Sequence, residues 1–576
     1  MSKLIKRTED EIHSYIYGQV DTSEGVTYSE YLLKKRIAMF EAKQYPTGKI
    51  DDLGRYQFWY DIITPRRNDE VKNLRVDSDN FGLHTDQPTK FFAHNAILNI
   101  KAKEYMTEGG YAVELKEDVS VFSGWGNVLW KSVKDGWKRR DLRNIYLTNT
   151  TARTVHDTDV IERHELTASQ LKQYERDAGW ENVDNVIEKL GDRMFNATKL
   201  AMSNPTSKKY YEVYERVGEV TEKEWNEING MEGGDENKTI LAKVIVAGLK
   251  RSEKDNKYIL FKEKIKSMDE VYVEAHRGEY QGRWMREGLI ELLFDHQVRA
   301  NDIGNQIANG LEWASKTWFR STDVQSYQNV MSDMDDGQII QSADMQQIQL
   351  RMQGFDQLMA DWNRNLQEAD RIANSFEITR GEEMKAQTPF RMGLLVNQNN
   401  NKLHIVLRQQ LGMAYRVIWK DWTLPNMTKE LKGEEIIRLT DDSVLYKLYQ
   451  NIAKNWYNNN LVRIGSVPRQ VREQLIAAKV AELSERGGID ISLKDMNWKE
   501  VLKTIHLSIT GENDDTDERV ADIAGFLGVE QRPGVRNYLL DKAYMLRGLD
   551  IPDDVKEEAP EAQPTAQGAE QLMGVA

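Results

Sequence analysis

The stretch IQLRMQGFDQLMADWNRNLQEADRIANSF, residues 348–376, decides the fold. Its apolar side chains recur at alternating spacings of four and three residues, on Ile348, Met352, Phe355, Met359, Trp362, Leu366, Ala369, Ala373 and Phe376. A repeat of 3.5 residues is typical of a long helix with one apolar seam. At 1.5 Å per residue the stretch would form a helix of ~43 Å. Such a seam can pack within one subunit or between the subunits of a ring.

Two further long helices are predicted on either side of this stretch. Residues 286–318 contain no proline and are dominated by helix formers, with Gly304 and Gly310 permitting close approach of another element. The polar break that follows, 319–345, is short, so the two helices form a hairpin. Thr388-Pro389 then predicts the start of a third helix, which runs to about residue 422.

The remainder of the chain mixes strands and helices. The β-rich block at 208–276 predicts an antiparallel sheet, with Gly233-Gly234-Asp235 in a loop between two strands. Short aromatic strands and turns are predicted within 105–150, among them FSGWGNVLW at 122–130. Residues 426–512 read as mixed strands and helices, and the proline-containing end of the chain reads as disordered. The predicted fold class is therefore α+β.

Composition excludes several classes of protein. The 576 residues include no cysteine, which rules out disulfides, iron–sulfur clusters and cysteine nucleophiles. The formal net charge of −14 argues against a broad surface that grips DNA phosphates. No run of 18 uncharged apolar residues is present, and MSKLIKRTEDE lacks the apolar core of a signal peptide, so we expect no membrane association.

The sequence offers little catalytic chemistry. The string Gly233–Thr239 resembles a phosphate-binding loop, but Asn237 replaces the second glycine and a strand follows, which favours a hairpin turn. The histidines and carboxylates at 156–165 could hold a divalent ion, although a polar turn and strand edge is the simpler interpretation. Glu382 and Glu383 beside Arg380 and Lys385 are interpreted as solvated loop charges. We expect no enzymatic activity, no cofactor and no bound metal.

The order of these parts resembles the portal proteins of tailed bacteriophages. The segments that carry the resemblance are GRWMREGLIELLFDHQVRANDIGNQIANGLEWASK and NRNLQEADRIANSFEITRGEEMKAQTPFRMGLLVNQNNNKLHIVLRQQLG, within residues 282–419. TPFRMGLLVNQNNNKL is most similar to the portals of the large, gut-type phages. Over roughly 205–550 the resemblance rests on architecture rather than on a strict motif.

The resemblance implies a role for each part of the chain. In chain order these are an N-terminal wing (1–285), a first stem helix (286–318), a clip (319–345), a second stem helix (346–377), a tunnel loop (378–389), a long helix with the rest of the wing (390–512), a crown (513–550) and a disordered tail (551–576). Arg380, Lys385 and Arg391 would lie near DNA phosphates in the channel. The family usually has a larger clip, with strands of its own.

It also implies partners and a place of action. The chain would form a ring, as a dodecamer, at one capsid vertex of the virion, after assembly in the host cytoplasm. Double-stranded DNA would pass through it, and it would contact the terminase large subunit, the major capsid protein and the head–tail adaptor. Two alternatives stay open at this point. One is another structural scaffold or adaptor built on coiled-coil-like helices, and the other is a metal-dependent nuclease that uses 156–165.

Overall fold

The computed structural model describes the chain in sections. The described residues are 3–18, 20–21, 27–45, 48–50, 54–74, 81–85, 92–134, 136–190, 210–249, 257–315, 318–320, 346–348, 354–374, 390–431, 436–439, 449, 453, 456–457, 469–484, 489–492 and 505–509. Residues 1–79 together with 83–507 form one compact unit, and 80–82 with 508–576 form a second. The predicted crown and tail lie outside the described residues.

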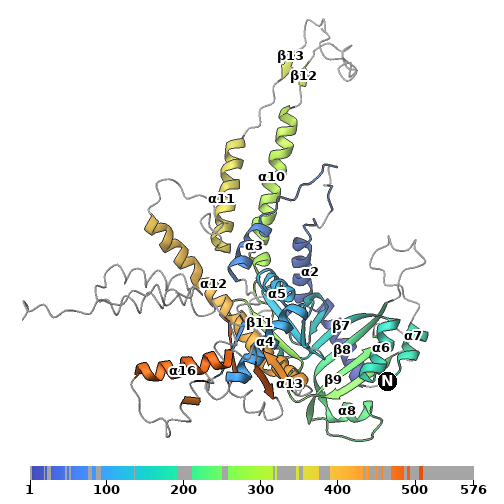
Figure 1. Ribbon diagram of the computed structural model, residues 1–576. Helices are drawn as coiled ribbons and strands as arrows, with labels where there is room; N and C mark the ends of the chain where they lie inside the picture. Colours follow the sequence, from blue (N-terminus) through green and yellow to red (C-terminus); the bar gives the residue numbers. More distant parts are fainter. Residues whose placement is uncertain are drawn as a thin grey trace, which may run out of the picture. The chain divides into compact units, whose positions relative to one another are not determined.

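A five-stranded antiparallel sheet forms the larger of two main sheets (Figure 1). Its order is β10-β9-β8-β7-β6, from Tyr258–Lys264, Thr239–Ala247, Tyr210–Thr221, Val160–Thr167 and Ile145–Leu147. The antiparallel sheet predicted at 208–276 is confirmed for β8, β9 and β10, and Gly233-Gly234-Asp235 does lie in the loop before β9. The last strand of that block, β11 (Tyr272–His276), instead pairs in the second sheet.

The second sheet has the order β11-β4-β5, with β4 at Asn127–Val133 and β5 at Gly136–Arg139. The prediction of strands over 122–130 is therefore right only from Asn127 onward. Residues Tyr111–Trp125 form helix α5, which ends where Gly126 takes a φ of +81°. A Cβ there would lie 2.3 Å from the carbonyl oxygen of Arg286, so only glycine allows this close approach.

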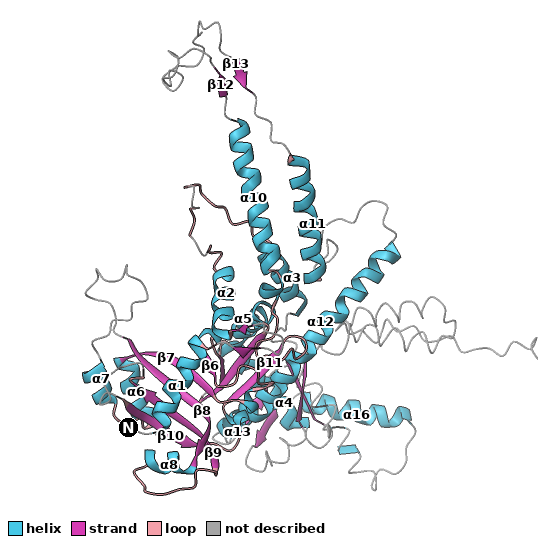
Figure 2. Cartoon of the chain, turned by 180° about the vertical axis from the view of Figure 1, so that it is seen from behind, coloured by secondary structure: helices cyan, strands magenta, loops and turns pink. Residues whose placement is uncertain are grey.

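Helices and short elements surround the sheets (Figure 2). The helices are α1 (Lys3–Tyr17), α2 (Glu30–Glu41), α3 (Ile63–Leu74), α4 (Phe92–Glu108), α6 (Ala168–Ala178), α7 (Val183–Leu190), α8 (Glu222–Ile228) and α16 (Arg469–Ser484). The remaining short elements are β1 (Val20–Asp21), β2 (Thr27–Tyr28), β3 (Phe81–Thr85), β14 (Ile436–Leu439), β15 (Ile489–Ser492), β16 (Ile505–Ile509), and single 3-10 turns at Leu142–Asn144, Val155–Asp157 and Met268–Glu270. The main core lies between the sheets, α1, α2 and residues 289–294, and a smaller one lies under α6 and α7.

Two antiparallel helices extend from this body as a hairpin (Figures 1 and 2). After a short turn, α9 (Leu289–Leu292), the first helix is α10 (Phe294–Ser315), and the second is α11 (Phe355–Ala373). Beyond α10, β12 (Trp318–Arg320) pairs with β13 (Gln346–Ile348), with Trp318 opposite Ile348. The hairpin predicted from the sequence is present, and the residues between these two strands lie outside the described residues.

Both helices of the hairpin are shorter than predicted. Ile348 lies on a strand, not on the second helix, because Gly354 takes a left-handed φ of +79° immediately before α11. Met352 and Phe376 lie outside the described residues. On α11 itself burial increases along the seam. Met359 is 36% exposed, Phe355, Trp362 and Leu366 are partly buried, and Ala369 and Ala373 are buried.

The base of the hairpin is joined to the body by polar contacts. The Arg66 guanidinium, buried on α3, pairs with Asp370 at 2.7 Å and donates to the carbonyl oxygen of Leu366 at 3.0 Å. Between the two helices, the imidazole of His296 hydrogen-bonds Asn365 at 2.8 Å. Hydrogen bonds with a charged donor are stronger than neutral ones, and these contacts fix α11 against α3 and α10.

An extended segment runs along α10 in matched register. The side-chain oxygens of Asn305, Asn301 and Gln297 accept from the backbone N–H groups of Phe58, Tyr60 and Ile62, at 2.9, 2.9 and 3.0 Å. Four helical residues rise about 6 Å and two extended residues about 6.6 Å, so the two spacings agree. Gly304 lies in this contact, where an added Cβ would be 2.4 Å from the Tyr60 ring.

The third predicted helix is α12 (Phe390–Ile418), which continues through a π turn at Trp419–Thr423 into α13 (Leu424–Leu431). The expected extent, 390 to about 422, is therefore confirmed, although the chain stays helical beyond it.

We expect Gly304→Ala to destabilise the protein by about 1–3 kcal/mol, because the methyl group must displace the Tyr60 ring. Thermal and denaturant unfolding would measure the change. Gln306→Ala, at an exposed position two residues further on, is the matched control and should leave stability nearly unchanged. Equal stability of the two variants would contradict this packing.

Candidate functional site

Helix α12 has two apolar faces, of which only one is covered. Leu407, Leu411, Ala414, Tyr415 and Ile418 are buried. The other face is an exposed apolar stripe at spacings of three, seven and four residues, formed by Leu403 (41% exposed), Val406 (50%), Met413 (58%) and Val417 (36%). One helix thus carries a second set of apolar side chains that the described part of the chain leaves exposed.

The covered face of α12 is fixed by a buried carboxylate. Asp118 of α5 accepts from the Trp130 indole N–H at 2.8 Å and from the Tyr415 hydroxyl at 3.0 Å, and its other oxygen lies 3.2 Å from Arg139. Burial raises the pKa of Asp118 to about 7, against the lowering effect of these donors. Tyr415 also packs on Trp130 and Trp137. The contact ties α12 to both α5 and β4.

The DNA-channel residues expected from the resemblance are only partly placed. Arg380 and Lys385, with the whole loop 378–389, lie outside the described residues. Arg391 lies in the first turn of α12. Of the predicted seam, Trp362 packs edge-on against Tyr60 at 5.7 Å between ring centroids, and Ala369 and Ala373 belong to the main core.

The histidines and carboxylates of 156–165 do not form one cluster. His156 lies 3.0 Å from Asp269, Asp159 pairs with Arg216, and Glu165 pairs with Arg163, each at a different place. Glu162 and His164, two residues apart on β7, share a face of the strand. They are brought together with Glu215 of β8, and the three ligand-type atoms lie within 4.8 Å of one another.

A lysine from the other sheet holds these carboxylates together. Glu162 and Glu215 are directly opposite each other on β7 and β8, where like charges repel. Lys131 of β4 places its Nζ 2.6 Å from Glu162 and in contact with Glu215. Additional donors surround the pair: His164 at 2.9 Å and Lys243 at 3.3 Å from Glu215, and Arg140 at 3.2 Å and the Tyr272 hydroxyl at 3.1 Å from Glu162.

This arrangement favours an ion pair over a metal site. Despite burial, which by itself raises them, the pKa values of Glu162 and Glu215 are lowered, mainly because of the Lys131 ammonium. That ammonium supplies the positive charge that a divalent ion would bring, at the position the ion would need. The sequence alone pointed to Glu162 and His164. It could not identify Lys131 and Glu215, since only the sheet register brings them there.

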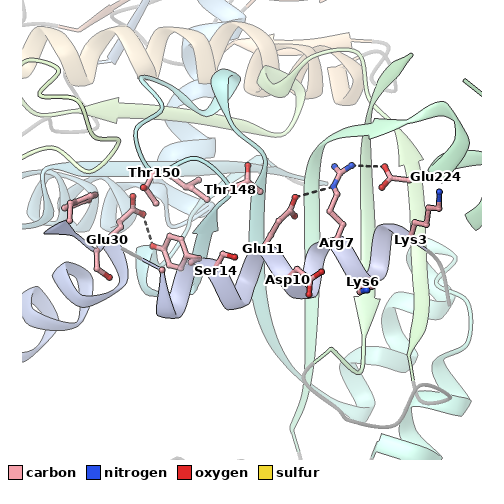
Figure 3. Close-up of a pocket in the computed structure, with 15 residues that line it drawn as sticks. Lys3, Lys6, Arg7, Asp10, Glu11, Ser14, Glu30, Thr148, Thr150 and Glu224 are labelled. Carbon is pink, nitrogen blue, oxygen red and sulfur yellow. Dashed lines mark hydrogen bonds and ion pairs between the residues drawn. The ribbon is translucent and has the colours of Figure 1, made fainter. Parts of the chain in front are cut away.

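A groove of about 730 Å³ runs along α1 (Figure 3). The positive charge of Arg7 in this groove is balanced by ion pairs with Glu224 at 2.8 Å and Glu11 at 3.3 Å. At the other end Glu30 accepts from Tyr15 and pairs with Lys34, both at 2.8 Å. Its second oxygen and the Thr150 hydroxyl are buried, and neither has a hydrogen-bond partner among the described residues. Paired charges and buried polar atoms without a protein hydrogen bond are typical of a groove that holds water.

Comparison with known protein families and curated proteins identified no relative of this chain. The chain matches no protein-family model, and no curated protein is similar enough to count as a match. None of the described helices is both long and apolar enough to cross a membrane.

We expect Lys131→Met to lower the free energy of unfolding at pH 7 by about 3–5 kcal/mol, because two buried carboxylates lose their counter-charge. Chemical denaturation would measure it, with exposed Lys138→Met on β5 as the control.

The loss should shrink as the pH falls from 7 to 5. In the native protein the lowered carboxyl pKa values give stability that is present above about pH 4.5 and lost as the pH falls through the folded pKa values. In the variant the carboxyl groups take up protons at higher pH, which relieves the unpaired charge. A loss that is independent of pH would contradict this role for Lys131.

Proposed function

We propose that this chain is the subunit of a portal: a ring at one capsid vertex through which a viral genome is packaged and ejected. The observation that carries the proposal is the sequence of elements from α10 to α12. Two antiparallel helices leave a mixed α/β body, a strand pair continues from their far ends, and a third long helix follows after 378–389.

In this proposal α10 and α11 are the stem, and the strand pair β12–β13 begins the clip. The family's clip usually has strands of its own, and β12–β13 supports that assignment. The body formed by the two sheets is the wing. The clip would face the terminase large subunit during packaging and the head–tail adaptor later, while the outside of the ring would face the major capsid protein.

The charge of the chain suits passage of DNA. A ring of subunits with a formal net charge of −14 repels phosphate over most of its surface, so DNA is not held along the wall. A few cations in the channel, at Arg380, Lys385 and Arg391, then supply local contacts. Double-stranded DNA is the proposed cargo, and the protein itself is proposed to be non-enzymatic and to act in the virion.

The alternatives have less support. A coiled-coil scaffold or adaptor would account for the seam on α11, but it does not account for two sheets that carry a hairpin and a third long helix. A metal-dependent nuclease would need an ion at Glu162, His164 and Glu215, where Lys131 already lies between the carboxylates.

Deleting 379–388 tests the channel role of the tunnel loop. We expect the variant to assemble as the wild type does and to lose DNA packaging or retention in particles, since the proposed contacts of the loop to DNA are removed. Native mass spectrometry and the DNA content of particles would measure the two properties.

Charge variants distinguish the effect of losing the cations from the effect of shortening the loop. Arg380→Glu with Lys385→Glu should impair packaging, whereas Arg380→Lys with Lys385→Arg should not. Failure of the deletion variant to assemble would indicate that the loop belongs to the subunit core. Unchanged packaging would indicate that the loop does not contact DNA in the channel.

A further inference from the structure

Side-chain amides recur at every fourth residue along α10. In chain order they belong to Gln297, Asn301, Asn305 and Asn309. The oxygens of the first three accept the N–H groups of Ile62, Tyr60 and Phe58, in that order. We define the strap as residues 54–62, all of which are described. The strap lies between α2 and α3 in the sequence and beside α10 in space (Figures 1 and 2).

Two of these amides also donate to the strap. The Nε2 group of Gln297 donates to the carbonyl oxygen of Tyr60 at 2.6 Å, and the Nδ2 group of Asn305 donates to that of Phe58 at 3.1 Å. An amide that both accepts and donates binds an extended backbone much as a neighbouring strand does. The contact is therefore a ladder, in which each step takes four residues of the helix and two residues of the strap.

The fourth amide lies one step further along the same ladder. Asn309 follows Asn305 by four residues, and the residue two positions before Phe58 is Tyr56. Among the described residues, no hydrogen bond engages the side chain of Asn309 or the backbone N–H of Tyr56. An acceptor and a donor are thus present at the next step, and the bond between them is not formed.

The N–H group of Tyr56 is on the edge of the strap that faces α10. Successive N–H groups of an extended chain point to opposite edges, and that of Phe58 points to α10. On the other edge, the N–H of Gln57 donates to the carbonyl oxygen of Lys49 at 2.8 Å, beside an antiparallel bridge between Ile50 and Tyr56. In a bridge of this type the N–H groups of the two bridged residues point away from each other, so that of Tyr56 points toward the helix.

Two opposing effects act on the next step of the ladder. The ring of Tyr60 lies against Gly304, where an added Cβ would be 2.4 Å from the ring. One step further along the helix the corresponding residue is Ala308, whose methyl group leaves less room for the ring of Phe58. Phe58 is 53% exposed and Tyr56 54%, and large apolar side chains gain free energy when they are covered. The methyl group thus opposes a further step, while burial and one hydrogen bond favour it.

We propose that the strap is a conformational device that closes on α10 by one further step. In the closed state the side chain of Asn309 accepts from the N–H of Tyr56, and the rings of Tyr56 and Phe58 pack against the helix. Closure extends the contact along α10 from residues 297–305 to 297–309, so the hairpin is held about 6 Å further from the body. This device belongs to the single subunit and does not depend on the proposed ring.

Hydrogen exchange at single-residue resolution tests the closed state in the full-length protein. The amide of Tyr56 should exchange at least about fivefold more slowly than in an unstructured peptide of the same sequence, but faster than that of Phe58. Asn309→Ala should remove the protection of Tyr56 and leave that of Phe58 unchanged. Asn309→Asp keeps an acceptor oxygen and should retain it, as should the control Gln306→Ala, at an exposed position off the ladder.

The absence of native cysteine allows a second measurement. Because the ring of Tyr60 lies against Gly304, two further steps of the ladder place residue 56 beside residue 312 in the closed state. A Tyr56→Cys, Glu312→Cys variant should therefore form a disulfide in oxidised glutathione, and adding Asn309→Ala should slow its formation at least about threefold. Tyr56→Cys with Asp302→Cys, about 15 Å along the helix from residue 312, should form none.

Either measurement can overturn the proposal. A Tyr56 amide that exchanges as fast as in the peptide would show that the fourth step does not form. Protection of Tyr56 that persists in Asn309→Ala, or a disulfide that forms equally fast with and without that substitution, would show that Asn309 does not hold the strap. Melting temperatures equal to that of the wild type would establish that the variants are folded.

Discussion

The carboxylate of Asp118 is the constraint on which the placement of α12 depends. It accepts hydrogen bonds from Trp130 of β4 and Tyr415 of α12, in a site so dry that its pKa rises to about 7. A buried polar group of this kind is costly unless it is satisfied, so only one rotation of α12 about its axis brings Tyr415 to it. That rotation buries Leu411 and Ile418 and leaves Met413 and Val417 exposed. The uncovered face of α12 is thus a consequence of how its covered face is held.

The body that supports the hairpin depends on a second buried contact. Glu162 and Glu215 are opposite each other within one sheet, and Lys131 reaches them from the other. The lysine offsets the repulsion between the two carboxylates on neighbouring strands. It also joins the two sheets. Removing one partner from such a group lowers the free energy of unfolding by more than the complete group adds to it, because a buried charge is left unpaired. The helical hairpin and the third long helix therefore extend from a body whose two sheets are joined by this contact.

Elements with a strong local pattern could be predicted from the sequence. The strands β8, β9 and β10, the two helices of the hairpin and the course of α12 all follow from runs of β-branched residues or from apolar spacing. Where prediction failed, a single backbone conformation decided the outcome. Helix α11 begins only after Gly354, so Ile348 is not part of it. Gly126 ends helix α5 and precedes strand β4 within FSGWGNVLW.

Contacts between distant parts of the chain could not be predicted. The histidines and carboxylates at 156–165 are neighbours in sequence, yet their partners are Asp269, Arg216 and Lys131, which sheet register and tertiary packing supply. The register of Asn305, Asn301 and Gln297 with an extended segment some 240 residues earlier leaves no periodic signal either. Such pairings depend on the fold as a whole rather than on local propensity.

The mass and symmetry of the purified, full-length protein test the central claim most directly. Native mass spectrometry combined with negative-stain class averages would measure both. If the chain is a portal subunit, as proposed, it should form a closed ring of about twelve copies around a central hole. A stable higher oligomer that is not a closed ring around a hole would contradict the account and favour a scaffold or adaptor.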